Sequence, residues 1–276
     1  MPALRDMKTE GRKIRMVTAY DYPTGLLVDQ TDIEMILVGD SLGMVVLGYD
    51  GTVPVTMEEM LHHLKAVARG AKHTLIVGDL PFMSYNISIE EAIRNAGRLM
   101  KEGGADCVKL EGGFAVAETI RAIVRAGIPV MAHIGLTPQT ASQLGGFKVQ
   151  GKDETAAERL VAEAAALQEA GAFALVLEAI PAPLAELITR KLAIPTIGIG
   201  AGVHCDGQVL VFHDMMGLFD RFVPKFVKRF ANTGEIIREA LNTYAAEVSS
   251  GAFPGPEHSF AMKDSAVLKK LDGAEK

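Results

Sequence analysis

The 276-residue sequence contains no tryptophan and only two cysteines, Cys107 and Cys205. The two cysteines lie far apart and form no CxxC pair, which argues against a disulfide scaffold and against a zinc site. We therefore expect two buried, reduced thiols in a cytosolic protein.

Long apolar runs and an excess of positive charge are also missing. No stretch approaches the ~20 apolar residues that span a bilayer, and the N-terminal MPALRDMKTEGRKIRM lacks the apolar core of a secretory signal. Lys and Arg number 28 against 34 Asp and Glu, a net charge of −6, which disfavours a nucleic-acid partner. The densest basic run, KFVKRF at 225–230, is expected to be mostly a solvated surface. The predicted protein is cytoplasmic and binds neither membranes nor nucleic acid.

Hydrophobic residues make up 49% of the chain, enough for a large core. They form short β-rich runs that alternate with longer amphipathic segments. Most of the runs show no polar alternation, which is typical of parallel strands covered on both faces. The predicted strands are Arg15–Tyr20, Met35–Gly39, Leu75–Gly78, Cys107–Leu110, Pro129–Ala132, Phe173–Leu177, Thr196–Ile199 and Gln208–Phe212.

Helix start and stop signals separate these strands. Thr56 with Glu59 and Ser88 with Glu91 have the spacing of a capping box. The segments that follow are predicted to be helical as far as about Gly70 and as far as Gly103. Further helices are expected over Val116–Ala126, Thr155–Ala170, Leu184–Lys191 and about 234–248.

A weak internal repeat supports one fold class. GGADCVKLEGG at 103–113 resembles AGAFALVLEAI at 170–180, each with a glycine stop, a strand and a glutamate. Eight strand–helix units without a linker predict a single α/β domain over 1–276, a (β/α)8 TIM barrel with 251–276 as a C-terminal tail. A doubly wound open sheet is the alternative.

Polar residues follow strand after strand. Because the carboxyl ends of barrel strands converge on one rim, where active sites are built, we expect these side chains to share one cavity. Singly, an acid at a strand end is more often a helix cap or a rim salt bridge, but the repetition favours a site. The candidates are Asp40, Ser41, Asp79, Lys109, Glu111, His133 and Glu178.

Clustered carboxylates repel one another unless a cation compensates them. Ligation by oxygen alone favours Mg²⁺ over zinc, and Mg²⁺ typically takes one or two protein carboxylates. Asp40 and Asp79 are the first predicted ligands, and Glu111 joins directly or through water. Glu178 lies on another strand, where it can act as a base. Metal and base together suggest proton abstraction beside the carbonyl of a chelated 2-oxo acid.

Three features keep alternatives open. Lys109 either pairs with Glu111, two positions on, or holds a substrate oxygen. His133 is placed with the substrate-binding residues, although a buried core histidine fits the pattern equally well. GIGAG at 198–202 lacks the GxGxxG spacing of a dinucleotide site; its glycines are expected to let backbone approach a ligand.

At these residues the sequence resembles the ketopantoate hydroxymethyltransferase family over nearly its whole length. The matching segments include MILVGDSLGMVVLGYDGTVPVT, VGDLPFMSY, VKLEGG, MAHIGLTPQ, VLEAIP and PTIGIGAGVHCDGQ. The resemblance implies a barrel of the phosphoenolpyruvate/pyruvate superfamily. It also implies hydroxymethyl transfer from 5,10-methylenetetrahydrofolate to 3-methyl-2-oxobutanoate, which forms 2-dehydropantoate for pantothenate biosynthesis.

The same resemblance assigns roles to residues. It implies Glu178 as proton acceptor and a ring-based homo-oligomer, a decamer. It implies a magnesium site at Asp40, Asp79 and Glu111, and contacts to the keto acid from Asp40, Ser41, Asp79 and Lys109.

Two rival functions remain at this stage. One is another Mg-dependent 2-oxo acid lyase or mutase on the same barrel, although the KCGH-type run of isocitrate-lyase-like enzymes is absent. The other is a non-catalytic barrel that binds a metabolite. Such a barrel has no need of a base like Glu178.

Overall fold

The computed structural model describes residues 1–143, 145–263 and 266–273. Its eight parallel strands follow one another around a closed barrel, and β1 pairs with both β2 and β8. The predicted barrel is confirmed, and the open-sheet alternative is wrong. The strands are β1 (Ile14–Thr18), β2 (Met35–Val38), β3 (Leu75–Asp79), β4 (Cys107–Glu111), β5 (Val130–Gly135), β6 (Ala174–Glu178), β7 (Thr196–Ile199) and β8 (Gly207–Leu210).

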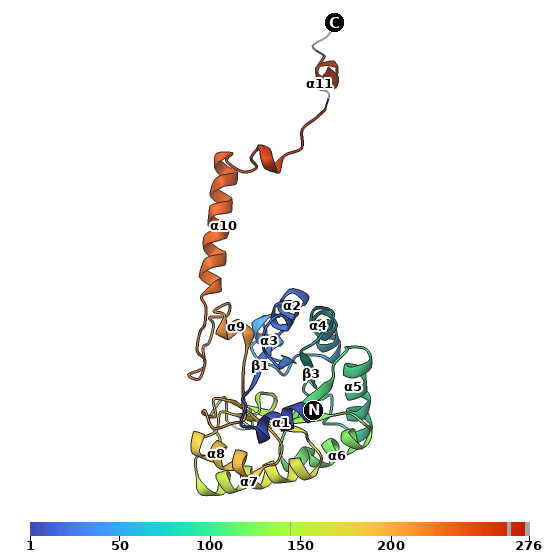
Figure 1. Ribbon diagram of the computed structural model, residues 1–276, viewed down its shortest axis with the longest axis vertical. Coiled ribbons are helices and arrows are strands. Elements are labelled where there is room, and N and C mark those ends of the chain that lie inside the picture. Colours follow the sequence, from blue (N-terminus) through green and yellow to red (C-terminus); the bar gives the residue numbers. More distant parts are fainter. Residues whose placement is uncertain (144, 264–265, 274–276) are drawn as a thin grey trace.

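Helices surround this barrel (Figure 1). Among the described residues they include all those predicted, with ends that agree to within two residues, and five that were not predicted: α1, α2, α3, α9 and α11. The helices are α1 (Pro2–Thr9), α2 (Tyr22–Asp29), α3 (Leu42–Val45), α4 (Met57–Gly70), α5 (Ile89–Lys101), α6 (Ala117–Arg125), α7 (Glu154–Glu169), α8 (Ala182–Lys191), α9 (Phe212–Met215), α10 (Thr233–Ser250) and α11 (Ala266–Leu271).

Side-chain caps begin two of the helices as predicted. The Thr56 hydroxyl accepts from the Glu59 amide at 3.2 Å, and the Glu59 carboxylate accepts from the Thr56 amide at 2.8 Å. The Ser88 hydroxyl accepts from the Glu91 amide at 3.2 Å. Each contact satisfies an amide that the first helical turn leaves free, and so fixes where α4 and α5 start.

The strands divide the apolar side chains between two cores. Outward residues such as Ile36, Val108 and Leu175 pack under the helices. Inward residues such as Met35, Cys107 and Met131 fill the barrel interior. Because side chains alternate along a strand, the inward row that is apolar at the start of β3, β4, β5 and β6 ends in polar residues at their carboxyl ends.

Helix α1 closes the amino-terminal end of the barrel. Its Leu4 and Met7 belong to the same buried cluster as the interior residues. Lys8 forms an ion pair of 2.6 Å with Asp206, just before β8. Two inward residues on a two-turn helix are too weak a periodic signal to predict from sequence, so the polar N-terminal segment was not assigned.

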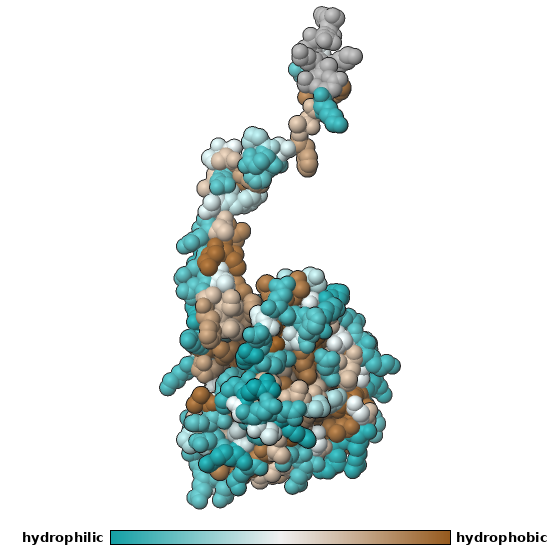
Figure 2. Space-filling model, viewed as in Figure 1, coloured by the Kyte–Doolittle hydropathy of each residue, from teal (hydrophilic) through white to brown (hydrophobic). Residues whose placement is uncertain are grey.

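Helix α10 differs from every other long helix. It stands away from the barrel (Figure 1), and none of its 18 residues is buried. Ile237, Leu241, Tyr244 and Val248 recur at helical spacing and are 47–62% exposed. Figure 2 shows hydrophobic residues along one side of this helix and hydrophilic ones along its other edge. Over the part of the chain that the structure describes, no helix combines the length and hydropathy needed to cross a membrane.

Candidate active site

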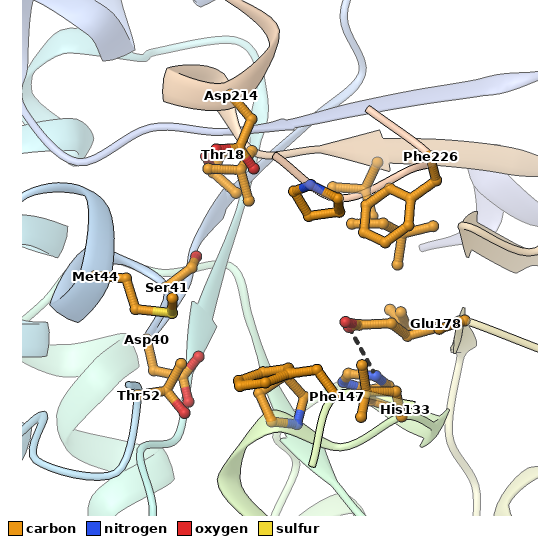
Figure 3. A pocket seen from close by; sticks show the side chains of 18 of the residues that line it. Thr18, Asp40, Ser41, Met44, Thr52, His133, Phe147, Glu178, Asp214 and Phe226 are labelled. Carbon is orange, nitrogen blue, oxygen red and sulfur yellow. Dashed lines mark ion pairs between the residues drawn. The ribbon is translucent and has the colours of Figure 1, made fainter. Parts of the chain in front are cut away.

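A cavity of about 330 Å³ opens at the carboxyl ends of the strands, within the size range of small-molecule sites. All seven residues predicted from the strand ends line it, and Figure 3 shows several of them facing one another. The residues that line the cavity include two groups, named here by their chemistry. The charged wall consists of Asp40, Asp79, Lys109, Glu111, His133 and Glu178; the aromatic wall consists of Phe219, Phe222 and Phe226, with Thr18 and Asp214 beside them.

Strand register positions the charged wall. Lys109 and Glu111 lie two apart on β4 and point inward, as the spacing predicts. Across the ladder, Asp79 is the neighbour of Lys109, and His133 is the neighbour of Glu111. The ends of β3, β4 and β5 therefore bring their polar side chains together without any loop.

Lys109 makes the shortest ion pair of the wall. Its Nζ lies 2.8 and 2.9 Å from the two oxygens of Asp79, and 3.6 Å from Glu111 Oε1. Burial opposes the charge of Lys109, but the three surrounding carboxylates outweigh it and raise the pKa of this amine. The nearest partner of Lys109 is thus Asp79 on the adjacent strand. If Lys109 served only as a structural ion-pair partner, Glu111 on its own strand was expected.

His133 lies between two carboxylates. Its Nδ1 is 3.4 Å from Glu111 Oε1 and its Nε2 is 3.3 Å from Glu178 Oε2, an ion pair drawn in Figure 3. Neither ring nitrogen makes a well-formed hydrogen bond. Burial alone would lower the pKa of His133. Glu111 and Glu178 more than offset that effect and raise the pKa to about 9. The imidazole is therefore a second cation at neutral pH.

Gln139 hydrogen-bonds to two of the predicted metal ligands, Asp40 and Glu111, and was not predicted from the sequence. Its side-chain amide donates to Asp40 Oδ2 at 2.9 Å and to the Leu80 carbonyl at 3.0 Å, and its backbone amide donates to Glu111 at 3.2 Å. The Tyr85 hydroxyl donates to Gln139 Oε1 at 2.6 Å, which fixes the orientation of the amide. Gln139 lies in a short turn after β5, inside the quoted MAHIGLTPQ, where no strand-end rule applies.

The carboxylates differ in how fully they are compensated. Burial, Asp79 and Glu111 raise the pKa of Asp40. Burial also raises the pKa of Asp79, which Lys109 offsets only in part. Burial likewise disfavours the charge of Glu111, but Lys109 and His133 outweigh it and lower its pKa. Four carboxylates against two cations leave negative charge concentrated around Asp40 and Asp79.

That surplus of oxygen ligands suits a hard dication. Asp40 and Asp79 are near neighbours, since the Asp40 amide lies 3.4 Å from Asp79 Oδ2. Within the described residues, however, no three His, Cys, Asp or Glu side chains are already arranged as metal ligands. A site of one or two carboxylates completed by water and substrate oxygens fits this geometry, as is usual for Mg²⁺. The three-carboxylate site stays a prediction.

The aromatic wall comes from the segment between α9 and α10, which includes KFVKRF. Phe226, within KFVKRF, lines the cavity and packs against the interior cluster. The rest of the run is mostly exposed, as expected, with Lys225, Lys228 and Arg229 in solvent. Gly200 of GIGAG has φ +65°, and a Cβ there would lie 2.7 Å from the Phe226 ring. The close approach that this glycine permits is to a side chain of the protein.

Asp214 is the second residue that sequence reasoning missed. The other candidates are polar residues that follow an apolar run. Asp214 fits this pattern too, because it follows the predicted end of the last strand by two positions. It is 7% exposed. Among described residues its carboxylate has no hydrogen bond or ion pair, and burial raises its pKa to about 6.

A cavity with clustered charged side chains at the carboxyl ends of barrel strands is where TIM-barrel enzymes have their active sites. Residues 1–256 match the family model described as ketopantoate hydroxymethyltransferase, and the chain belongs to this family. The 3-methyl-2-oxobutanoate hydroxymethyltransferase of Heliobacterium modesticaldum is 64% identical, with 96% of each chain covered. That of Moorella thermoacetica is 64% identical over 94% of this chain and 97% of its own. The protein is a hydroxymethyltransferase.

Solved structures agree on the fold. A phosphonopyruvate hydrolase in complex with oxalate and Mg²⁺ matches with a TM-score of 0.61 at 13% identity, over 99% of this chain and 94% of its own. A 2,3-dimethylmalate lyase of the PEP mutase/isocitrate lyase superfamily matches with a TM-score of 0.58 at 16% identity, over 99% and 94%. At such identities the likeness concerns the barrel alone.

Proposed function

We propose that the protein transfers a hydroxymethyl group from 5,10-methylenetetrahydrofolate to 3-methyl-2-oxobutanoate, forming 2-dehydropantoate for pantothenate biosynthesis. The names of the relatives support the keto acid substrate. The observation that carries the mechanism is that Glu178 faces the same cavity as the Asp79–Lys109 pair. The two free, buried cysteines fit the reducing cytoplasm, where we place the reaction.

Binding of the keto acid uses the charged wall. Lys109 supplies a buried cation for the oxygens of the 2-oxo acid, and the Ser41 hydroxyl, held 2.9 Å from the Tyr20 hydroxyl, supplies a donor. Asp40 and Asp79 would hold Mg²⁺, with Glu111 joining directly or through water. When bound, the metal acts as a Lewis acid that withdraws charge from the substrate's oxygens.

Glu178 performs the proton transfer. Its carboxylate takes the proton from C3 of the keto acid, and the C–H electron pair becomes available at C3. That pair forms the new bond to the methylene carbon of the folate as one of the two C–N bonds of the methylene bridge breaks. Water then supplies the hydroxyl group as the second C–N bond breaks, and the two folate nitrogens take up one proton from Glu178 and one from that water. His133 lies between Glu111 and Glu178, with its Nε2 3.3 Å from Glu178 Oε2, and so holds the Glu178 carboxylate in position for the transfer.

Solvent exchange at C3 tests this proposal. With Mg²⁺ and no folate, the enzyme should exchange the C3 proton of 3-methyl-2-oxobutanoate for deuterium, as followed by NMR. Adding 5,10-methylenetetrahydrofolate should then give 2-dehydropantoate. Binding without exchange would favour the metabolite-binding barrel. Carbon–carbon cleavage of a larger 2-oxo acid, without transfer, would favour the lyase.

We further propose that the protein works as a homo-oligomer. The apolar face of α10 lies outside the barrel that the same chain forms, and such a face is normally covered by a partner. The decamer stays an expectation from the family resemblance. Light scattering should report a multiple of the 29.5 kDa chain. Leu241→Asp should reduce that mass, whereas Arg238→Asp, on the same helix, should not.

A further inference from the structure

Asp214 is a buried carboxylate that the proposed chemistry does not use. It lies in α9, just after β8, and its side chain reaches the cavity beside Thr18 (Figure 3). It is more than nine-tenths buried, yet no hydrogen bond or ion pair to it exists among the described residues. A carboxylate taken out of water in this way is unfavourable unless something supplies donors.

The neighbouring protein groups do not supply those donors. The Tyr20 and Ser41 hydroxyls share a hydrogen bond of 2.9 Å in which either can donate. The Thr18 hydroxyl accepts from the Phe212 amide at 2.9 Å and keeps its own O–H, but within the described residues it makes no hydrogen bond to Asp214. The His213 ring is stacked near Tyr20, with centroids 5.5 Å apart, and its Nδ1 has no partner. Arg229 is the cation that acts on Asp214, from a distance. Because Asp214 lines the cavity, a ligand bound there can supply the missing donors.

The surroundings of Asp214 are shaped for a flat, largely apolar ligand. Phe219, Phe222 and Phe226 line the same cavity as Asp214, and so do Val209 and Val211. Rings of this kind stack on planar heterocycles. A small keto acid offers no such surface, and its carboxylate would be repelled by Asp214.

We propose that Asp214 binds the 2-amino-4-oxo pyrimidine edge of the pterin, and so anchors the folate co-substrate opposite the charged wall. This edge carries a ring N–H and an amino N–H side by side, and the two oxygens of one carboxylate can accept both. The inference rests on the proposed function, because it assigns a site to the donor named there.

The mouth of the cavity agrees with this orientation. Lys148 and Lys225 line it and are exposed. With the pterin edge at Asp214, the anionic glutamate tail of the folate extends outward to these cations. The methylene carbon then lies between the tail and the pterin edge, where it can approach the keto acid on the charged wall.

Asp214→Asn tests the assignment. An asparagine amide has the same shape but offers one acceptor and one donor, so it cannot accept both N–H groups. We expect KM for 5,10-methylenetetrahydrofolate to rise roughly 10–100-fold, the range for a charge-assisted hydrogen bond. The C3 proton exchange of the keto acid, measured without folate, should be unchanged. Asp220→Asn, on the exposed part of the same segment, is the matched control.

Calorimetry with ligand analogues separates direct binding from a structural effect. Tetrahydrofolate and its 2-desamino counterpart are titrated into enzyme that holds Mg²⁺ and keto acid. The wild type should prefer tetrahydrofolate by about tenfold or more, and Asp214→Asn should bind both alike. Equal discrimination by the two proteins overturns the assignment, as does an unchanged KM. A wild type that exchanges C3 but never uses the folate instead refutes the proposed donor.

Discussion

The two walls of the cavity treat negative charge in opposite ways. On the charged wall, Asp79 and Glu111 lie within 4 Å of Lys109, and Glu178 lies 3.3 Å from His133. On the aromatic wall, Asp214 is buried without any such partner among described residues. The first arrangement offsets part of the carboxylate charge with cations of the protein before a ligand arrives, most fully at Glu111, whose pKa Lys109 and His133 lower. The second leaves a carboxylate whose partner must come with the ligand.

The difference indicates where chemistry and recognition take place. Groups that bind a metal or move a proton need a defined protonation state, which internal cations provide. A recognition group gains most when its hydrogen bonds exist only in the complex, because the wrong ligand leaves it unsatisfied. One cavity can therefore hold both kinds of site on facing walls.

Removing the base should have the largest effect. Glu178→Gln keeps the side chain's size but cannot accept the C3 proton. We expect C3 exchange to fall by about 10²–10⁴-fold, while calorimetric affinity for the keto acid in the presence of Mg²⁺ is retained. Glu169→Gln, at the exposed end of α7, is the control. Normal exchange in Glu178→Gln would remove this residue as the base.

Uncoupling the buried ion pair should have the next largest effect. Asp79→Asn leaves Lys109 without its nearest charge partner, and we expect the free energy of unfolding to fall by about 3–5 kcal/mol in urea titrations. Mg²⁺-dependent binding of the keto acid should be lost as well. Adding Lys109→Met should cost less than the two single changes together, because the charges act as a pair. Unchanged calorimetric affinity would count against Asp79 as a metal ligand.

The smallest effect should appear at Asp214, and with the opposite sign. Its folded pKa of about 6 lies above the ordinary value of 3.8. Between these values the native state binds the extra proton, so stability falls as pH rises through that window. Asp214→Asn removes this penalty. Because water in the cavity screens the charge, we expect the free energy of unfolding to rise by only about 1 kcal/mol, or Tm by ~2–4 °C, at pH 7.5. The gain should disappear near pH 4; a loss of stability at pH 7.5 would contradict an unpaired carboxylate.

The sequence predicted most of the charged wall because strand periodicity and barrel geometry together determine it. Asp79, Lys109, Glu111, His133 and Glu178 are inward residues at the carboxyl ends of strands, and the fold alone brings such positions together. Their apolar runs were long enough to recognise, and the observed strand ends lie within three residues of the predicted ones.

The parts that were missed come from segments without a period. Gln139 acts from a three-residue turn, and Phe226 approaches the barrel from a loop rich in charge. Asp214 lies on a four-residue helix. For Gln139 and Phe226 the tertiary contacts decide where the side chain points, and no local pattern records them, whereas Asp214 follows the predicted end of the last strand by two positions.

Helix α1 has a consequence for the order of events. Since Leu4 and Met7 close the amino-terminal end of the barrel, we expect reactants and products to enter and leave at the carboxyl-terminal end. A folate seated against the phenylalanine rings would obstruct the passage to Lys109. The kinetics should therefore be sequential, with the keto acid entering before the carbon donor and the spent donor departing before the product.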